Sequence, residues 1–200
     1  MSDIDEEEEK DVGELKSLKS AADTLFHRLD ECSIPDIDCA SYQECIAMYL
    51  RILKLSVTFK DEVVCRLNIA SCFWRLGEWK RIQSHCSTVI QSCSKEENKD
   101  TWQYEIRAHY LMLLALTKLD EQSAMVEINK HAKKLHNLVL VHRASLSTDH
   151  IYDYEQTLNY INSMPDFHKQ QQNINTELRL ADDFQALGCH EQVLTVFHLN

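Results

Sequence analysis

The chain has 200 residues, a formal net charge of −11 and a hydrophobic content of 44%, which suit one folded domain with a sizeable core. The acidity disfavours nucleic acid as a partner, because its phosphates would be repelled. No apolar run reaches the ~18 residues that a membrane-spanning helix needs, so we expect no membrane segment. With only 3 Gly and 2 Pro, the composition predicts long helices, short connections and an all-α fold.

The N-terminal segment is strongly acidic. Its first 11 residues carry seven acidic side chains against one Lys, and they show no apolar periodicity. We predict that residues 1–12 form a disordered acidic tail, with the frayed lead-in to a helix as the alternative. A single helical domain is then predicted over 13–200.

Two helices are predicted in the first quarter of the domain. The first begins at Gly13, and its apolar residues recur on one side at Leu15, Leu18, Ala22, Leu25, Phe26 and Leu29. A loop around Pro35 follows. Ser41, with Glu44 three residues later, predicts a capping box at the start of the second helix, which carries Ile46, Tyr49, Leu50 and Leu53.

The stretch 67–90, LNIASCFWRLGEWKRIQSHCSTVI, holds two amphipathic helical patterns that are interrupted once, at Gly77. Glycine can adopt the left-handed conformation that ends many helices, so Gly77 predicts the end of the first helix. The first face comprises Ile69, Ala70, Phe73 and Leu76, and the second comprises Trp79, Ile82, Cys86, Val89 and Ile90. The pattern predicts an antiparallel helical hairpin.

Ala70, Phe73, Gly77 and Trp79 stand at the offsets of a tetratricopeptide repeat (TPR), and the hairpin resembles that family. The phrase LNIASCFWRLGEW is most similar to the middle repeat of immunophilin-type co-chaperones. The resemblance implies a right-handed superhelix of TPR-type antiparallel hairpins with a concave groove. Only a dozen acidic residues precede the repeats, so we expect no isomerase domain. An ordinary helical hairpin in another all-α protein is the alternative.

With this hairpin as template, we predict repeats over about 14–56, 60–93 and 101–135, and a degenerate or truncated unit over about 150–200. The turn of the third repeat, 118–120, lacks a glycine, which leaves its register open by one residue. Ser147 and Thr148 are candidate caps of a helix that ends before Pro165. The last segment repeats the template offsets at Ala181, Phe184, Gly188, Val193 and Phe197.

Catalytic patterns are absent from the sequence. It contains no nucleophile elbow, zinc-protease motif, phosphate-binding loop or dinucleotide fingerprint. His85 and Cys86 are neighbours, but adjacent residues of a helix point about 100° apart and cannot readily share a proton. The eight Cys show no zinc spacing, and we expect them to be buried thiols of a reducing compartment. We therefore predict a cytoplasmic protein, also compatible with the nucleus, that is not an enzyme and uses no cofactor or metal.

The resemblance also implies a binding site. In such co-chaperones, a carboxylate clamp of Lys, Asn and Arg side chains holds the C-terminal peptide of a chaperone. Lys19, Asn68 and Arg107 match three of the five clamp positions. Asp23 replaces an Asn, which costs about 1–4 kcal/mol against an incoming carboxylate. Leu111 replaces an Arg, which removes a bond worth roughly 1.5–3 kcal/mol.

Each matching residue also has a purely structural interpretation. Lys19 would be a solvated lysine, Asn68 an amide that packs between helices, and Arg107 a partner of Glu105 or Asp120. A degenerate clamp would also suit a different, less acidic peptide.

The sequence therefore predicts a non-catalytic, co-chaperone-like adaptor for a protein or peptide partner, with a heat-shock chaperone C-terminus as one candidate. The alternative is a structural subunit or homodimer that uses its C-terminal helices as an interface. That interface would include Phe184, Val193, Phe197 and Leu199.

Overall fold

A computed structural model describes the chain except for residues 1–2, 32–38, 56, 97–99, 120–123 and 165–200, and for 3–12 and 30–31 it describes the backbone alone. The described residues form seven α-helices and one short 3₁₀ helix, and no strand. The helices are α1 (Asp3–Glu31), α2 (Cys39–Ile52), α3 (Phe59–Leu76), α4 (Trp79–Lys95), α5 (Trp102–Leu116), α6 (Ala124–His142) and α7 (Thr148–Asn162), with η1 (Arg143–Ser145) before α7. The all-α prediction is confirmed.

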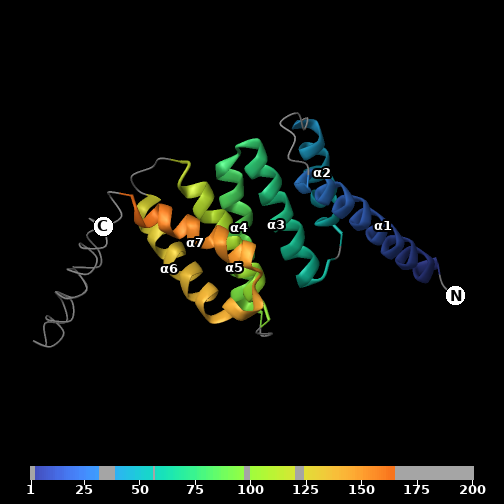
Figure 1. Ribbon diagram of the computed structural model, residues 1–200. Coiled ribbons are helices and arrows are strands. Elements are labelled where there is room, and N and C mark those ends of the chain that lie inside the picture. Colours follow the sequence, from blue (N-terminus) through green and yellow to red (C-terminus); the bar gives the residue numbers. More distant parts are fainter. Residues whose placement is uncertain (1–2, 32–38, 56, 97–99, 120–123, 165–200) are drawn as a thin grey trace, which may run out of the picture.

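Each helix packs on the next one along the chain, from α1 and α2 at one end to α6 and α7 at the other (Figure 1). In addition, α3 contacts α5 directly. Two reversals of the chain separate these helices, so α3 and α5 run in the same direction (Figure 1). None of the described helices is long and apolar enough to cross a membrane.

The hairpin α3–α4 follows the sequence pattern closely. Ile69 and Ala70 of α3 and Ile82, Cys86 and Val89 of α4 are all completely buried. Their burial on facing helices comes from the 3.6-residue period of the apolar positions. The predicted hairpin is confirmed.

Local signals define the ends of α3. At its start, the Thr58 hydroxyl accepts a hydrogen bond from the Asp61 amide, at 3.2 Å. At its end, Gly77 adopts φ +72°, and the amides of Gly77 and Glu78 donate to the carbonyls of Trp74 and Phe73 at 3.2 and 3.0 Å. These two bonds form a Schellman motif, which requires the left-handed residue that only glycine supplies without strain.

Some predicted boundaries differ from the structure. The capping role of Ser41 is wrong, because α2 begins at Cys39 and Ser41 already lies inside the helix. At the N-terminus, α1 begins at Asp3, so the backbone of the acidic segment 3–12 is helical and the domain boundary predicted at 13 falls within α1. Acidic side chains in the first turns of a helix suit its dipole.

The C-terminal predictions are tested only in part. The predicted cap at Ser147 is confirmed, because its hydroxyl accepts from the amide of His150 at the start of α7, at 3.3 Å. The turn residue Asp120 and the predicted interface residues Phe184, Val193, Phe197 and Leu199 lie outside the described residues.

We expect Gly77→Ala to destabilise the protein by about 1–2 kcal/mol, the cost of a left-handed conformation for an L-residue. An added Cβ would meet only Trp79, at an ordinary 3.6 Å, so backbone strain alone sets this loss. The matched control is Gly13→Ala in the exposed part of α1, where a Cβ meets nothing within 4 Å. That change should stabilise by up to ~1 kcal/mol. Urea unfolding of both variants measures the difference, and equal effects would contradict the assignment of strain to Gly77.

Candidate functional site

A cavity of about 690 Å³ opens among α1, α3, α5 and α7, with Tyr42 as a contribution from α2. Ligand pockets commonly have volumes of ~300–1,000 Å³, so the cavity is large enough to hold part of a peptide. Helices α1, α3, α5 and α7 alternate along the chain with α2, α4 and α6. The cavity therefore belongs mainly to one face of the helical array.

The lining of this cavity includes side chains of three kinds. Some are apolar and buried, among them Cys72, Ile106 and Leu111. Half-buried aromatic side chains follow at Phe26, Trp74, Trp102 and Tyr110. The polar lining among the described residues includes two arginines, one acid, two histidines and several uncharged side chains, namely Arg75, Arg107, Asp153, His27, His150, Ser71, Gln103, Ser145 and Ser147. The described lining thus combines apolar and aromatic side chains with charged groups of both signs.

Arg107 and Leu111 are the two predicted clamp residues that line the cavity. The Arg107 Nη2 donates to Ser71 Oγ at 3.0 Å, and the Ser71 hydroxyl in turn donates to the Leu67 carbonyl at 3.1 Å. The guanidinium carbon lies 5.8 Å from the ring centre of Phe26, within the range of a cation–π contact. Leu111 lies one helical turn further along α5, and only 6% of it is exposed. It therefore forms apolar lining where the resemblance implied a cation.

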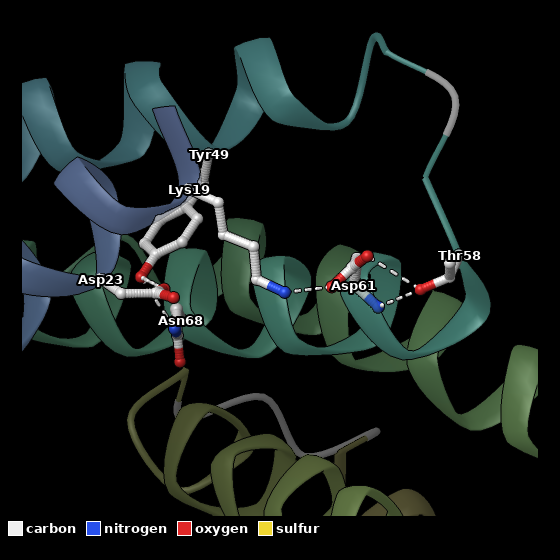
Figure 2. A network of polar contacts seen from close by, with 6 residues as sticks. All are labelled: Lys19, Asp23, Tyr49, Thr58, Asp61 and Asn68. Carbon is white, nitrogen blue, oxygen red and sulfur yellow. Dashed lines mark hydrogen bonds and ion pairs between the residues drawn. The ribbon is translucent and has the colours of Figure 1, made fainter. Parts of the chain in front are cut away.

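Lys19 lies outside the lining of the cavity and forms an ion pair with Asp61 on α3 (Figure 2). Asp61 also accepts a hydrogen bond from the Thr58 hydroxyl at 2.8 Å. The hydrogen bond between the two side chains raises the pKa of Lys19 and lowers the pKa of Asp61. The Lys19 side chain is 37% exposed. A ligand carboxylate at this position would have to compete with Asp61 for the ammonium group.

Asp23 and Asn68 meet at the hydroxyl of Tyr49, a completely buried residue of α2 (Figure 2). The Tyr49 hydroxyl donates to Asp23 Oδ1 at 2.8 Å and accepts from Asn68 Nδ2 at 2.9 Å. Burial, together with the bond to Asp23, raises the pKa of Tyr49 well above its ordinary value. Asn68 is only 5% exposed. This pair of bonds therefore links α1, α2 and α3, as the structural interpretation of Asn68 expected.

The structure therefore separates the five predicted residues into three groups. Lys19 pairs with Asp61, Asp23 and Asn68 share Tyr49, and Arg107 and Leu111 line the cavity. Sequence reasoning missed the cavity residues Trp74, Arg75, Trp102 and Tyr110. The sequence did contain a pattern that points to Arg75. Ser71 and Arg75 are four residues apart on α3, as Arg107 and Leu111 are on α5, and residues at this spacing share one face of a helix. The contribution of α7 to the same cavity depends on tertiary packing and has no signal in the sequence.

We expect Tyr49→Phe to destabilise the protein by about 1–3 kcal/mol, because the buried amide of Asn68 loses its acceptor. A double-mutant cycle with Asn68→Ala should give a coupling energy of about 0.5–3 kcal/mol, since the two side chains are in contact. Tyr160→Phe is the control, because that tyrosine is 59% exposed on α7. A coupling near zero in denaturant unfolding would contradict the bridging role of the Tyr49 hydroxyl.

The cysteines have the environments of structural thiols. Cys45, Cys65, Cys72, Cys86 and Cys93 are buried, and the described cysteines form no disulfide with one another. Burial raises the pKa of Cys86 to about 12, so its thiol stays protonated near neutral pH. The neighbouring His85 packs against the Phe73 ring, with centroids 5.7 Å apart. These surroundings do not favour a Cys–His nucleophile.

His109 of α5 and His131 of α6 form a pair that the sequence reasoning missed. Their Nδ1 atoms are 2.7 Å apart, and the two residues are 5% and 7% exposed. One ring must therefore donate its Nδ1–H to the Nδ1 of the other. On the far side of His131, Nε2 lies 3.5 Å from Glu127 Oε2. Neither histidine lines any of the described cavities.

Burial and the neighbouring imidazole lower the pKa of His109 to about 3, and burial also lowers the pKa of His131. Lys130 lowers the pKa values of both histidines and Lys134 lowers that of His109, while Glu127 acts in the opposite direction on His131. Below the ordinary histidine pKa of 6.5, the unfolded chain therefore binds more protons than the folded one. Stability contributed by neutral histidines is then lost as the pH falls through this range.

Replacing His109 by Phe should weaken the loss of stability between pH 7 and pH 5, because the variant has one buried imidazole fewer to protonate on unfolding. The matched control is His136→Phe, which replaces an exposed histidine of the same helix as His131. Parallel pH profiles for the parent and His109→Phe would contradict this role of the pair.

Within the described part of the chain, no three His, Cys, Asp or Glu side chains gather in a way that could hold a metal ion. Comparison with family models, with curated proteins and with solved structures gave no match to this chain. The tetratricopeptide resemblance therefore depends on the residues of the α3–α4 hairpin and its neighbours.

Proposed function

We propose that this chain is a non-catalytic adaptor of tetratricopeptide type, which holds a peptide segment of a partner protein in the cavity among α1, α3, α5 and α7. One observation carries the proposal: the cavity is lined mainly by every second helix of a series in which consecutive helices pack on one another. A right-handed superhelix of hairpins would have its first helices on the concave face in this way. An apolar and aromatic lining with a few polar groups is typical of binding sites.

The proposal also specifies the cellular compartment and the class of partner. Five of the six described cysteines are buried and none of the six forms a disulfide with another, which is typical of a reducing compartment, so we propose that the adaptor lies in the cytoplasm or nucleus. The negative charge of the chain disfavours nucleic acid, which leaves a protein segment as the partner we propose.

The narrower form of the proposal is a co-chaperone that binds a heat-shock chaperone C-terminus through Lys19, Asp23, Asn68, Arg107 and Leu111. Internal partners already bind Lys19, Asp23 and Asn68, so a terminal carboxylate would displace existing contacts. Calorimetry with a chaperone tail peptide tests this form directly. Affinity that is unchanged by both Lys19→Ala and Asn68→Ala would exclude the clamp while leaving the broader adaptor proposal in place.

We expect random-peptide display against the parent chain to enrich peptides that bind in the cavity. Leu114→Trp places a large ring in the lining of the cavity. It should lower the affinity of the chain for the enriched peptides about tenfold, which corresponds to about 1.4 kcal/mol. The matched control is Leu140→Trp on α6, where the leucine is 64% exposed and outside the cavity. Circular dichroism of both variants checks that they fold. Enriched peptides that tolerate Leu114→Trp would place binding elsewhere and contradict the proposal.

A second candidate function is a structural subunit or homodimer that uses its C-terminal helices. Five exposed large hydrophobic side chains on the described parts of α6 and α7 favour it, at Val126, Leu140, Val141, Tyr152 and Tyr160. Light scattering of the full chain across a range of concentrations separates the two proposals. A monomer of 23.3 kDa at every concentration excludes the homodimer.

A further inference from the structure

We propose that Cys45 of α2 and Cys72 of α3 form a redox site, in which hydrogen peroxide that enters the cavity converts the two thiols into a disulfide between the helices. Both residues are thiols in this structure. The modification is reversible, because a low-molecular-weight thiol can reduce a disulfide again by exchange. The proposal does not depend on peptide binding, so either proposal can fail while the other stands.

The two thiols lie against each other where α2 packs directly on α3. Cys45 is completely buried and Cys72 is 1% exposed. The Cys72 thiol donates a hydrogen bond to the Cys45 sulfur. The Cys45 thiol in turn donates a weak hydrogen bond to the Ala22 carbonyl of α1, with 3.9 Å between sulfur and oxygen. Cysteines whose side chains point apart cannot be bridged without backbone movement, and the hydrogen bond between these two thiols shows that they point towards each other.

The hydrogen bond also sets the acidity of Cys45. It lowers the pKa of Cys45, and this effect outweighs burial, which acts in the opposite direction. Burial raises the pKa of Cys65 and Cys86 to about 12 and the pKa of Cys93 to about 11. Of these four thiols, Cys45 therefore forms a thiolate most readily. The thiolate is the form that attacks an oxidised sulfur.

Cys72 gives an oxidant access to the pair. It lines the cavity among α1, α3, α5 and α7, whereas Cys45, Cys65, Cys86 and Cys93 line none of the described cavities. A molecule inside the cavity therefore reaches the pair through Cys72. The burial of both thiols restricts the class of oxidant. Hydrogen peroxide is small enough to reach a thiol with so little exposed surface, whereas a bulky disulfide such as oxidised glutathione is not.

The reaction has two steps. In the first, the Cys72 sulfur attacks one oxygen of the peroxide, the O–O bond breaks, and the second oxygen leaves with the thiol proton as water. Cys72 is thereby oxidised to a sulfenic acid. In the second, the Cys45 thiolate attacks the Cys72 sulfur, the S–S bond forms and the S–O bond breaks, and the departing hydroxide takes up the proton that Cys45 released. Two thiols and one peroxide thus become one disulfide and two waters.

The disulfide changes how the first three helices are held together. It joins α2 to α3 covalently, and a cross-link between residues 45 and 72 stabilises the folded chain mainly by restricting the unfolded one. It also removes the S–H group that bonds to the Ala22 carbonyl of α1. Oxidation therefore strengthens the connection of α2 to α3 and removes one contact between α1 and α2.

The test treats the full chain with hydrogen peroxide at neutral pH without denaturant, alkylates the remaining thiols, and digests the product with trypsin without reduction. Cleavage after arginine gives the peptides 29–51 and 67–75, which contain Cys45 and Cys72. We expect these peptides to appear linked, with a mass two hydrogens below their sum, and dithiothreitol to separate them. Fragmentation of the linked product distinguishes Cys45 from the other two cysteines of peptide 29–51. The oxidised chain should also unfold at a higher urea midpoint than the reduced chain.

Variants separate this pair from oxidation in general. Cys45→Ala and Cys72→Ala should each abolish the link and the rise in the urea midpoint. The matched control is Cys86→Ala, which removes another buried thiol, on α4 and outside the described cavities, and should leave both effects intact. Cys39→Ser removes an exposed thiol and should also leave them intact. Circular dichroism of each variant checks that it folds.

Several results would overturn the proposal. One is a parent chain in which peroxide oxidises the exposed Cys39 but does not link the two peptides. Another is oxidation of Cys72 to a sulfinic acid with no link, because Cys45 would then be unable to reach it. A link that persists in Cys45→Ala would assign the bond to a different cysteine. A link that oxidised glutathione forms as fast as peroxide does would contradict entry of the oxidant through the cavity.

Discussion

The packing of α3 is the constraint on which the rest of the structure depends. This helix contacts α2, α4 and α5, and an ion pair and a hydrogen-bonded bridge connect it to α1. A helix with neighbours on so many sides needs small residues where backbones approach, and Ala70 and Cys72 fill two such positions with almost no exposure. A larger side chain at Ala70 would force the neighbouring helices apart, because protein interiors have little free volume.

Because α3 is enclosed in this way, its polar residues are committed to internal contacts. Asn68 sits in the buried part of the helix and satisfies its amide through Tyr49, whose hydroxyl also binds Asp23. A buried amide without a partner would be costly, so the bridge stabilises the junction of three helices. The replacement of an amide by Asp23, which weakens the predicted clamp, thus has a structural explanation: a carboxylate is a good acceptor for a tyrosine hydroxyl in a partly buried position.

Further along the array, the same helix contributes to an open surface. Ser71 and Arg75 of α3 face the cavity together with Arg107 of α5, and α1 and α7 complete it. In one region of α1, α2 and α3, polar side chains bond to one another, as Lys19 does to Asp61 and Asn68 does to Tyr49. In another region, polar and aromatic side chains line the cavity. The binding role that we propose for this chain draws on the end that holds the cavity.

The sequence by itself determined the all-α class and the central hairpin, because apolar spacing, Gly77 and the small residues act over one or two helical turns. The five clamp positions came from the family resemblance, and two of them, Arg107 and Leu111, line the cavity. Only the tertiary structure decided that Lys19 pairs with Asp61, that Asp23 and Asn68 share one hydroxyl, and that His109 meets His131 across α5 and α6. These contacts join residues 19 or more positions apart, and helical periodicity carries no information about which neighbouring helix a side chain will meet. The same reason explains why Arg75 emerged as a cavity residue only when α3 was seen beside α5.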